Sequence, residues 1–292
     1  MTPSEHDYRS IWTALMRVPF EQAWVEAAGL KTRYAHAGQR GRPALLMLHG
    51  TAGSWEGFAA NLGPLAEHFD CYAIDMMGSG LTDKPDHPYQ VADYVRHVHA
   101  FMDAMALTKA SVIGCSLGAW VAARFALSHP ARLERLVLLS AAGLFANAAN
   151  MNRIRSARTA AVDDPSWANI KPIFDHLIHD ERHRIPDIIA VRQAVYREPD
   201  MAMAMGHILC LQDPEIRQRN LIAEDEWRRI QAPALVVGSL ADKDEYLETA
   251  RRVSRLMPNA RYVEMPAVGH WPHFEDPATF NPLCVDFLRG AD

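Results

Sequence analysis

The sequence predicts an α/β fold, in which a mostly parallel sheet is flanked by helices and a helical cap, or lid, is inserted. Three observations lead to this prediction. Strand-like apolar runs alternate with helical patterns over residues 43–141, a long helix-like segment without a buried strand run follows, and the alternation then returns. This order is typical of a parallel sheet covered on both faces. We therefore expect a core of residues 1–144 and 229–292 and a cap of residues 145–228.

The elements of the core follow from hydrophobic periodicity. Residues 20–27 and 31–37, separated by Ala-Gly-Leu, predict an opening hairpin. Further strands, most of them continuous apolar runs, are predicted at residues 43–50, 71–78, 110–115, 133–141, 232–239 and 260–266. Apolar residues at helical spacing predict helices at residues 91–107, 117–130, 246–257 and 277–290. Within the cap, joints between helices are marked by Pro165, Pro172, Pro186, Pro199 and Pro214.

The amino-acid composition limits the kinds of molecule that the protein is expected to bind. The chain has 292 residues, of which 49% are hydrophobic and 22% charged, and its formal net charge is −5. Such a balance gives no basic surface for nucleic acid or an anionic membrane, and the motifs described below lead us to expect a small-molecule substrate. The four cysteines lie far apart, which excludes a zinc ribbon or a disulfide scaffold and indicates a reducing compartment. The polar start has no apolar stretch, so we expect a cytoplasmic protein.

A Gly-x-Ser-x-Gly motif lies at the centre of the predicted sheet. It spans Gly114 to Gly118, between the strand at residues 110–115 and the following helix. A strand, a sharp turn and a helix in this order hold a serine hydroxyl above the sheet, and the tightness of the turn demands small neighbours. Ser116 is therefore the candidate nucleophile. Cys115 precedes it, and its side chain is expected to point into the protein as an apolar filler.

A serine nucleophile needs a base and an acid that orients the base. In this fold the acid follows a late strand and the histidine follows the last strand. The loop "LADKDEY" after the strand at residues 232–239 offers Asp242 first, with Asp244 as the reserve. His270 comes after the last predicted strand and before the closing helix. We expect Ser116, Asp242 and His270 to form a catalytic triad that needs no metal.

Two backbone N–H groups are candidates for stabilising negative charge on the substrate. The first buried strand ends in "HGTAG", a loop of small residues that can aim the N–H of Thr51 at the serine. The N–H of Leu117 lies at the start of the helix after Ser116. Together they would form an oxyanion hole for a tetrahedral intermediate.

These residues together resemble the α/β-hydrolase superfamily, and the histidine region resembles most the meta-cleavage-product hydrolases. The stretch "VGHWPHFEDPATFN" matches their motif at Gly269, His270, Trp271, Glu275, Phe280 and Asn281. The resemblance implies hydrolysis of a carbon–carbon bond in a vinylogous 1,5-diketone made by opening an aromatic ring. It also implies that no cofactor is needed and that the protein is a homo-oligomer, a dimer or larger.

The resemblance implies further substrate-binding residues, and the sequence also departs from the family pattern. Asn61, Arg192 and Trp271 fall on family binding positions, with Arg192 expected to contact a substrate carboxylate. The loop "HGTAGSW" lacks the usual Gly-Pro-Gly element, Cys115 stands where asparagine is common, and Asp242 lies one residue further from Gly238 than usual. A carboxylesterase or lactonase with the same triad is the alternative function, and a non-catalytic receptor of the same fold is a third.

Overall fold

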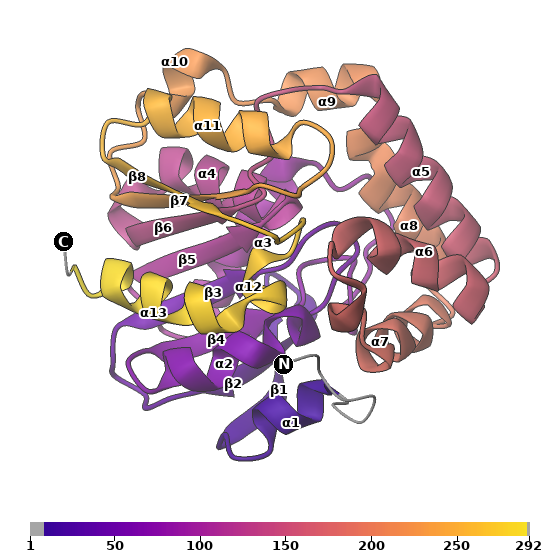
Figure 1. Ribbon diagram of the computed structural model, residues 1–292, viewed down its shortest axis with the longest axis horizontal. Helices are drawn as coiled ribbons and strands as arrows, with labels where there is room; N and C mark the ends of the chain where they lie inside the picture. Colours follow the sequence, from indigo (N-terminus) through magenta and orange to yellow (C-terminus); the bar gives the residue numbers. More distant parts are fainter. Residues whose placement is uncertain (1–8, 291–292) are drawn as a thin grey trace.

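An eight-stranded sheet forms the centre of the computed structural model, which describes residues 9–290 (Figure 1). The strand order across the sheet is β1-β2-β4-β3-β5-β6-β7-β8. The strands are β1 (Phe20–Ala27), β2 (Leu30–Ala37), β3 (Ala44–Leu48), β4 (Asp70–Ile74), β5 (Ala110–Cys115), β6 (Leu133–Leu139), β7 (Ala234–Ser239) and β8 (Ala260–Met265). β1 and β2 form the predicted antiparallel hairpin, and β2 pairs antiparallel with β4. All other neighbours are parallel, which confirms the predicted sheet type.

Helices cover both faces of the sheet, because its central strands are apolar on both sides. Every residue of β4, β5 and β7 is buried. In Figure 1, α2 and α13 lie in front of the sheet and α3 and α4 behind it. The core helices are α1 (Ile11–Leu15), α2 (Ala59–Ala66), α3 (Val91–Ala104), α4 (Leu117–Ser128), α11 (Tyr246–Leu256), α12 (Pro272–Glu275) and α13 (Pro277–Leu288), with short 3-10 turns at Trp55–Phe58 and Pro130–Arg132.

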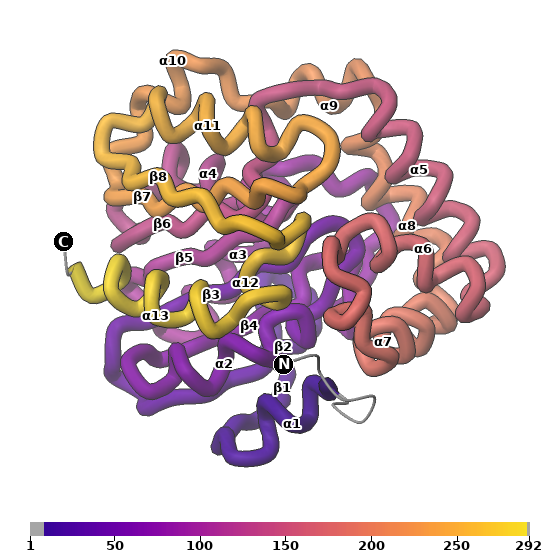
Figure 2. The backbone as a smooth tube through the Cα atoms, viewed as in Figure 1, coloured from indigo at the N-terminus to yellow at the C-terminus, as the bar shows by residue number. Residues whose placement is uncertain are grey.

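A block of helices separates β6 from β7 in the sequence. It contains α5 (Ala148–Asp163), α6 (Trp167–Leu177), α7 (Pro186–Tyr196), α8 (Met201–Ile208), α9 (Pro214–Asn220) and α10 (Glu224–Trp227), with 3-10 turns at Glu181–His183 and Leu209–Gln212. Helices α5 to α8 lie together on one side of the sheet (Figure 1), and the tube in Figure 2 shows the chain leaving the sheet and returning to it. Within residues 9–290, no helix is both long and apolar enough to cross a bilayer.

The predicted strand at residues 71–78 runs furthest past the observed one. The apolar run at residues 71–78 continues past the end of β4 at Ile74, because Asp75 turns the chain out of the sheet. Its carboxylate is fully buried and accepts hydrogen bonds from the backbone N–H groups of Trp55 and Leu81 at 2.8 and 2.9 Å. It also pairs with the buried guanidinium of Arg33 at 2.5 Å. The turn therefore anchors the loop after β3, which forms one wall of the site described below.

Candidate active site

Ser116 occupies a sharp turn between β5 and α4. Its backbone angles are φ 55° and ψ −114°, a left-handed conformation that is strained for a residue other than glycine. A Cβ on Gly114 would lie 2.3 Å from the carbonyl oxygen of Gly118, and one on Gly118 would lie 2.2 Å from that of Leu48. Both motif positions therefore require glycine. The turn presents the serine at the carboxyl end of β5, where the neighbouring strands also end.

His270 and Asp242 meet at the same edge of the sheet. The His270 Nδ1 atom lies 3.1 Å from each carboxylate oxygen of Asp242. The hydroxyl of Ser140 lies 2.7 Å from one of these oxygens and 2.8 Å from the backbone oxygen of His270, so it fixes both partners. Asp244, the reserve acid, points elsewhere: its carboxylate lies 2.8 Å from Arg153 and 3.1 Å from His176, both on cap helices.

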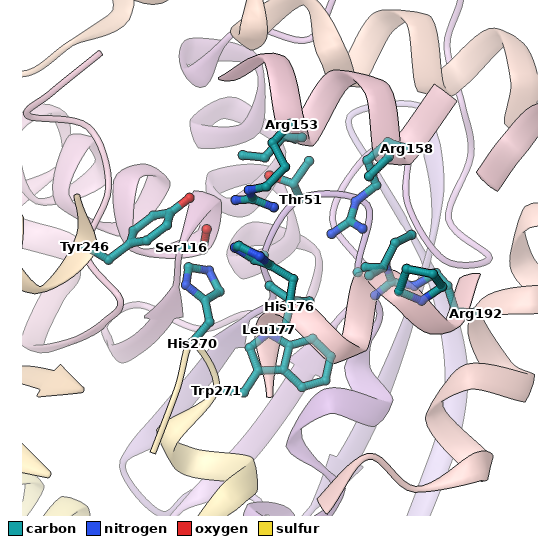
Figure 3. Close-up of a pocket in the computed structure, with 16 residues that line it drawn as sticks. Thr51, Ser116, Arg153, Arg158, His176, Leu177, Arg192, Tyr246, His270 and Trp271 are labelled. Carbon is teal, nitrogen blue, oxygen red and sulfur yellow. The ribbon is translucent and has the colours of Figure 1, made fainter. Parts of the chain in front are cut away.

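A cavity of about 240 Å³ lies between this edge of the sheet and the helices of the cap. Ser116 and His270 line it from the core, and Figure 3 shows the serine hydroxyl and the imidazole ring on the same side. No aspartate or glutamate is among its lining residues. A second cavity of about 20 Å³ also borders Ser116, and it is lined by apolar side chains (Leu117, Trp120, Ala142, Ile154, Ile208 and Leu211) and by the polar Gln212, Arg217 and Tyr246.

Thr51 and Leu117 bring two free N–H groups to these cavities. Thr51 lines both cavities and Leu117 the smaller one. No backbone carbonyl among residues 9–290 accepts either N–H group. His49 holds the loop in place: its Nε2 accepts the N–H of Met76 at 2.9 Å, so the proton is on Nδ1, which donates to the carbonyl of Gly50 at 2.7 Å. Burial lowers the pKa of His49 to about 4, which keeps the ring neutral in this role.

Cys115 cannot compete with Ser116 as a nucleophile in this arrangement. Its thiol is 1% exposed and lies 3.7 Å from the backbone oxygen of His270. Burial raises the pKa of the Cys115 thiol far above its usual range. The side chain therefore packs as an apolar group behind the histidine.

The structure brings Arg192 and Trp271 to the cavity and leaves Asn61 outside it. Arg192, on α7, lines the cavity and is 4% exposed, and Trp271 packs edge to face on Phe174 with ring centroids 5.7 Å apart. The Asn61 amide donates to the backbone oxygen of His273 at 2.8 Å and to the side-chain oxygen of Asn281 at 2.7 Å. Asn61 thus links α2 to α12 and α13. It is not among the residues that line the cavity, where the expected substrate contact would be made.

Glu275, a motif residue without an assigned role, joins the histidine loop to the cap. One carboxylate oxygen accepts the N–H of Gly269 at 2.8 Å. The other accepts the N–H groups of His179 at 2.8 Å and Asp180 at 3.3 Å, which follow α6. The N–H of His270 also donates to the carbonyl of Leu177 at 2.8 Å. The position of His270 is therefore set by the core and the cap together.

Comparison with known proteins identifies the family. The model of the alpha/beta hydrolase fold matches residues 43–277. The chain belongs to the α/β hydrolase fold family. This α/β hydrolase is 31% identical, over 94% of its own length and 93% of the relative's, to the 2-hydroxy-6-oxo-6-(2'-aminophenyl)hexa-2,4-dienoic acid hydrolase of Metapseudomonas resinovorans.

Two further similar proteins carry related names. The 2-hydroxy-6-oxo-2,4-heptadienoate hydrolase of Pseudomonas putida is 26% identical, with 92% of this chain and 96% of the relative covered. The solved meta-cleavage product hydrolase of Pseudomonas fluorescens is 25% identical, covers 92% of this chain and 98% of its own, and gives a TM-score of 0.80. The resemblance found in the histidine region is thus confirmed across the whole chain, and the protein is a hydrolase.

Tyr246 and Arg158 are among the residues of this α/β hydrolase's cavity that sequence reasoning missed. Tyr246 follows the acid loop, and its ring meets the His270 ring edge to face with centroids 4.3 Å apart. Arg158 lines the cavity from α5 and is 7% exposed. Met151, Ala161 and Arg158 are all buried at helical spacing on α5. An arginine within the buried stripe of a helix was the signal that could have revealed it.

Proposed function

We propose that this protein is a serine-dependent hydrolase of meta-cleavage products, the 2-hydroxy-6-oxo-dienoates formed by opening aromatic rings. One observation carries the proposal. Arg192 is buried in the wall of the cavity that contains Ser116, and no carboxylate among residues 9–290 pairs with it. A buried guanidinium facing a cavity favours a substrate with its own carboxylate, as these dienoates have. An ordinary ester would leave this charge without a partner.

In the proposed reaction, the dienol is first converted to its keto form, with a proton added at the carbon next to the bond to be broken. Ser116 Oγ then attacks the carbonyl carbon while His270 takes the serine proton, and Asp242 holds the histidine tautomer. The N–H groups of Thr51 and Leu117 stabilise the oxyanion. The carbon–carbon bond breaks, its electron pair moves through the conjugated chain to the keto oxygen, and the proton held by His270 passes to the resulting dienolate oxygen. Water activated by His270 releases the acid from Ser116.

The two cavities indicate how the substrate lies. Its carboxylate would reach toward Arg192 in the larger cavity, and Trp271 would pack against the unsaturated chain. The acyl group would enter the smaller cavity beside Trp120 and Leu211. Because this second cavity is only about 20 Å³, we propose that short acyl groups are preferred.

Hydrolysis of an ester or a lactone by the same residues is the alternative function. Both functions use acyl transfer to Ser116, but only the first requires protonation at carbon before cleavage. Purified protein would be given a yellow 2-hydroxy-6-oxo-dienoate and, separately, p-nitrophenyl acetate. We expect loss of the yellow colour with a kcat/KM well above that for the ester. Strong ester turnover with no bleaching would reject carbon–carbon bond hydrolysis.

Arg192→Gln provides the matched variant in the same assay. It should raise KM for the dienoate by at least about tenfold, since it removes a charge-assisted contact, and leave ester turnover within about threefold. Equal losses on both substrates would count against a carboxylate contact. We propose further that the reaction takes place in the cytoplasm and that the protein is a dimer or larger, which size-exclusion chromatography with light scattering would test.

A further inference from the structure

Two cap arginines lie buried in the wall of the Ser116 cavity without a carboxylate partner. Within residues 9–290, Arg158 makes no hydrogen bond or ion pair, and its Nε atom is buried and unsatisfied. Arg192 donates one hydrogen bond of 3.3 Å to the hydroxyl of Tyr196. Its guanidinium also lies over the rings of Phe174 and Tyr196, at 5.4 and 5.5 Å from their centroids. Neither positive charge is neutralised by a carboxylate of residues 9–290.

The other charges around the cavity do not compensate for this pair. Arg153, the third arginine of the lining, already pairs with Asp244 at 2.8 Å. No aspartate or glutamate lines the cavity. Burial lowers the pKa of Arg158 to about 10, and the positive charges of Arg192 and Arg153 act in the same direction, yet Arg158 stays protonated at neutral pH. Buried charges are normally paired, so two unpaired ones facing a cavity indicate a ligand with negative charge.

The position of the two arginines indicates which part of the ligand is charged. Figure 3 shows Arg158 and Arg192 together on one side of the cavity, with Ser116 and His270 on the opposite side. A single carboxylate can accept hydrogen bonds from both guanidinium groups, but it brings one negative charge against their two positive charges. Two carboxylates would satisfy both.

We propose that Arg158 and Arg192 together bind two carboxylates, so that the enzyme selects dicarboxylic substrates whose charged end lies away from the acyl carbon. Hydrolysis would then yield a dicarboxylic acid and a short monocarboxylic acid. The inference rests on the proposed function for the position of the bond that is cleaved. The binding of two carboxylates does not depend on which bond that is.

Direct binding tests the inference without any reaction. Isothermal titration calorimetry at low salt would compare the purified protein's affinity for succinate and glutarate with that for butyrate and valerate, which have the same chain lengths and one carboxylate. We expect the better dicarboxylate to bind at least about tenfold more tightly than its monocarboxylate counterpart. In Arg158→Gln the difference should fall to about twofold or less, and in Arg158→Lys it should largely persist. Arg155→Gln, at an exposed position of the same helix, should keep the full difference.

Thermal unfolding separates binding from a structural role. Removing an unpaired buried charge should raise the melting temperature of Arg158→Gln or leave it unchanged, whereas loss of a structural contact would lower it. Equal affinity of the wild-type protein for mono- and dicarboxylates would overturn the inference, and so would a full preference retained in Arg158→Gln. If the protein bleached a monocarboxylate dienoate yet showed no dicarboxylate preference, the proposed function would stand and this inference would fall.

Discussion

The Nδ1 atom of His270 lies 3.1 Å from both carboxylate oxygens of Asp242. Asp244, two residues later, forms an ion pair with Arg153 and contacts His176 instead. We therefore expect Asp242→Asn to lower kcat by about 10³- to 10⁴-fold with little change in KM, because the amide favours the wrong histidine tautomer. Asp244→Asn should lower kcat by less than about tenfold. Steady-state kinetics on one substrate compares the two variants directly, and the reverse ranking would contradict the assignment of Asp242.

Ser116 and Cys115 can be separated by paired substitutions. Ser116→Ala should reduce kcat by at least about 10⁴-fold, because the remaining groups have no nucleophile to activate. Cys115→Ala should keep kcat within about tenfold, since the thiol is buried behind His270. Mass spectrometry after brief exposure to a p-nitrophenyl ester should find the acyl group on Ser116. A Cys115→Ala protein that folds and is inactive would refute this division of roles.

Glu275 offers a test of how the histidine loop is held. In Glu275→Gln, an amide NH₂ would face a backbone N–H of Gly269 or His179, each of which now donates to the carboxylate at 2.8 Å. We expect the free energy of unfolding to fall by about 1–3 kcal/mol. We also expect kcat to fall more than KM changes, because His270 is displaced.

The control for this variant is Glu248→Gln, at an exposed position on α11. It should match the wild-type protein in urea unfolding and in kinetics. If Glu275→Gln lost stability and kept its full kcat, Glu275 would hold the fold and have no part in placing His270.

Three buried histidines predict loss of stability in acid. Burial lowers the pKa of His49 and His97 to about 4 and that of His273 to about 3. In the unfolded chain these rings take up a proton near pH 6.5, so below that pH the unfolded state binds more protons than the folded one. Stability contributed by the neutral rings is therefore complete above about pH 6.5 and is lost progressively as the pH falls toward 4. Each ring lowers the free energy of unfolding by at most about 1.4 kcal/mol for each pH unit of acidification.

Urea unfolding at pH 7, 6 and 5 measures this slope. His97→Gln keeps an acceptor for the N–H of Met77, which now donates to Nδ1 at 3.1 Å, and removes one titrating ring. Its unfolding free energy should vary less with pH than that of His87→Gln, whose ring is exposed. Identical slopes in the two variants would mean that His97 does not control the acid response.

The parallel sheet and the chain order of serine, acid and histidine could be predicted from the sequence. Buried parallel strands appear in it as long apolar runs. The prediction failed where a polar residue ended a strand from within the core, as Asp75 does after β4. It ranked Asp242 above Asp244 only by their order in one loop, whereas the fold shows which carboxylate faces His270.

The substrate-binding residues were the least predictable part of the site. Asn61 matched a family position by type, but its amide NH₂ donates to His273 and Asn281, more than 200 residues away in sequence. The place of Arg158 in the buried stripe of α5 is a sequence signal for burial, but that pattern does not show that the side chain binds a ligand. Its isolation becomes visible only when the surrounding helices are assembled and no acid is found beside it.

The helices of the cap leave the sheet after β6 and rejoin it at β7, and these two strands are paired neighbours, with Leu139 beside Val237. The helical block therefore begins and ends at two adjacent strands of the sheet. Its length and sequence can change without shifting the register of any other strand pair. Replacing this helical block by that of a relative would change the residues that recognise the substrate and leave Ser116, Asp242 and His270 in place. Evolution and protein engineering can therefore alter specificity at the same two junctions.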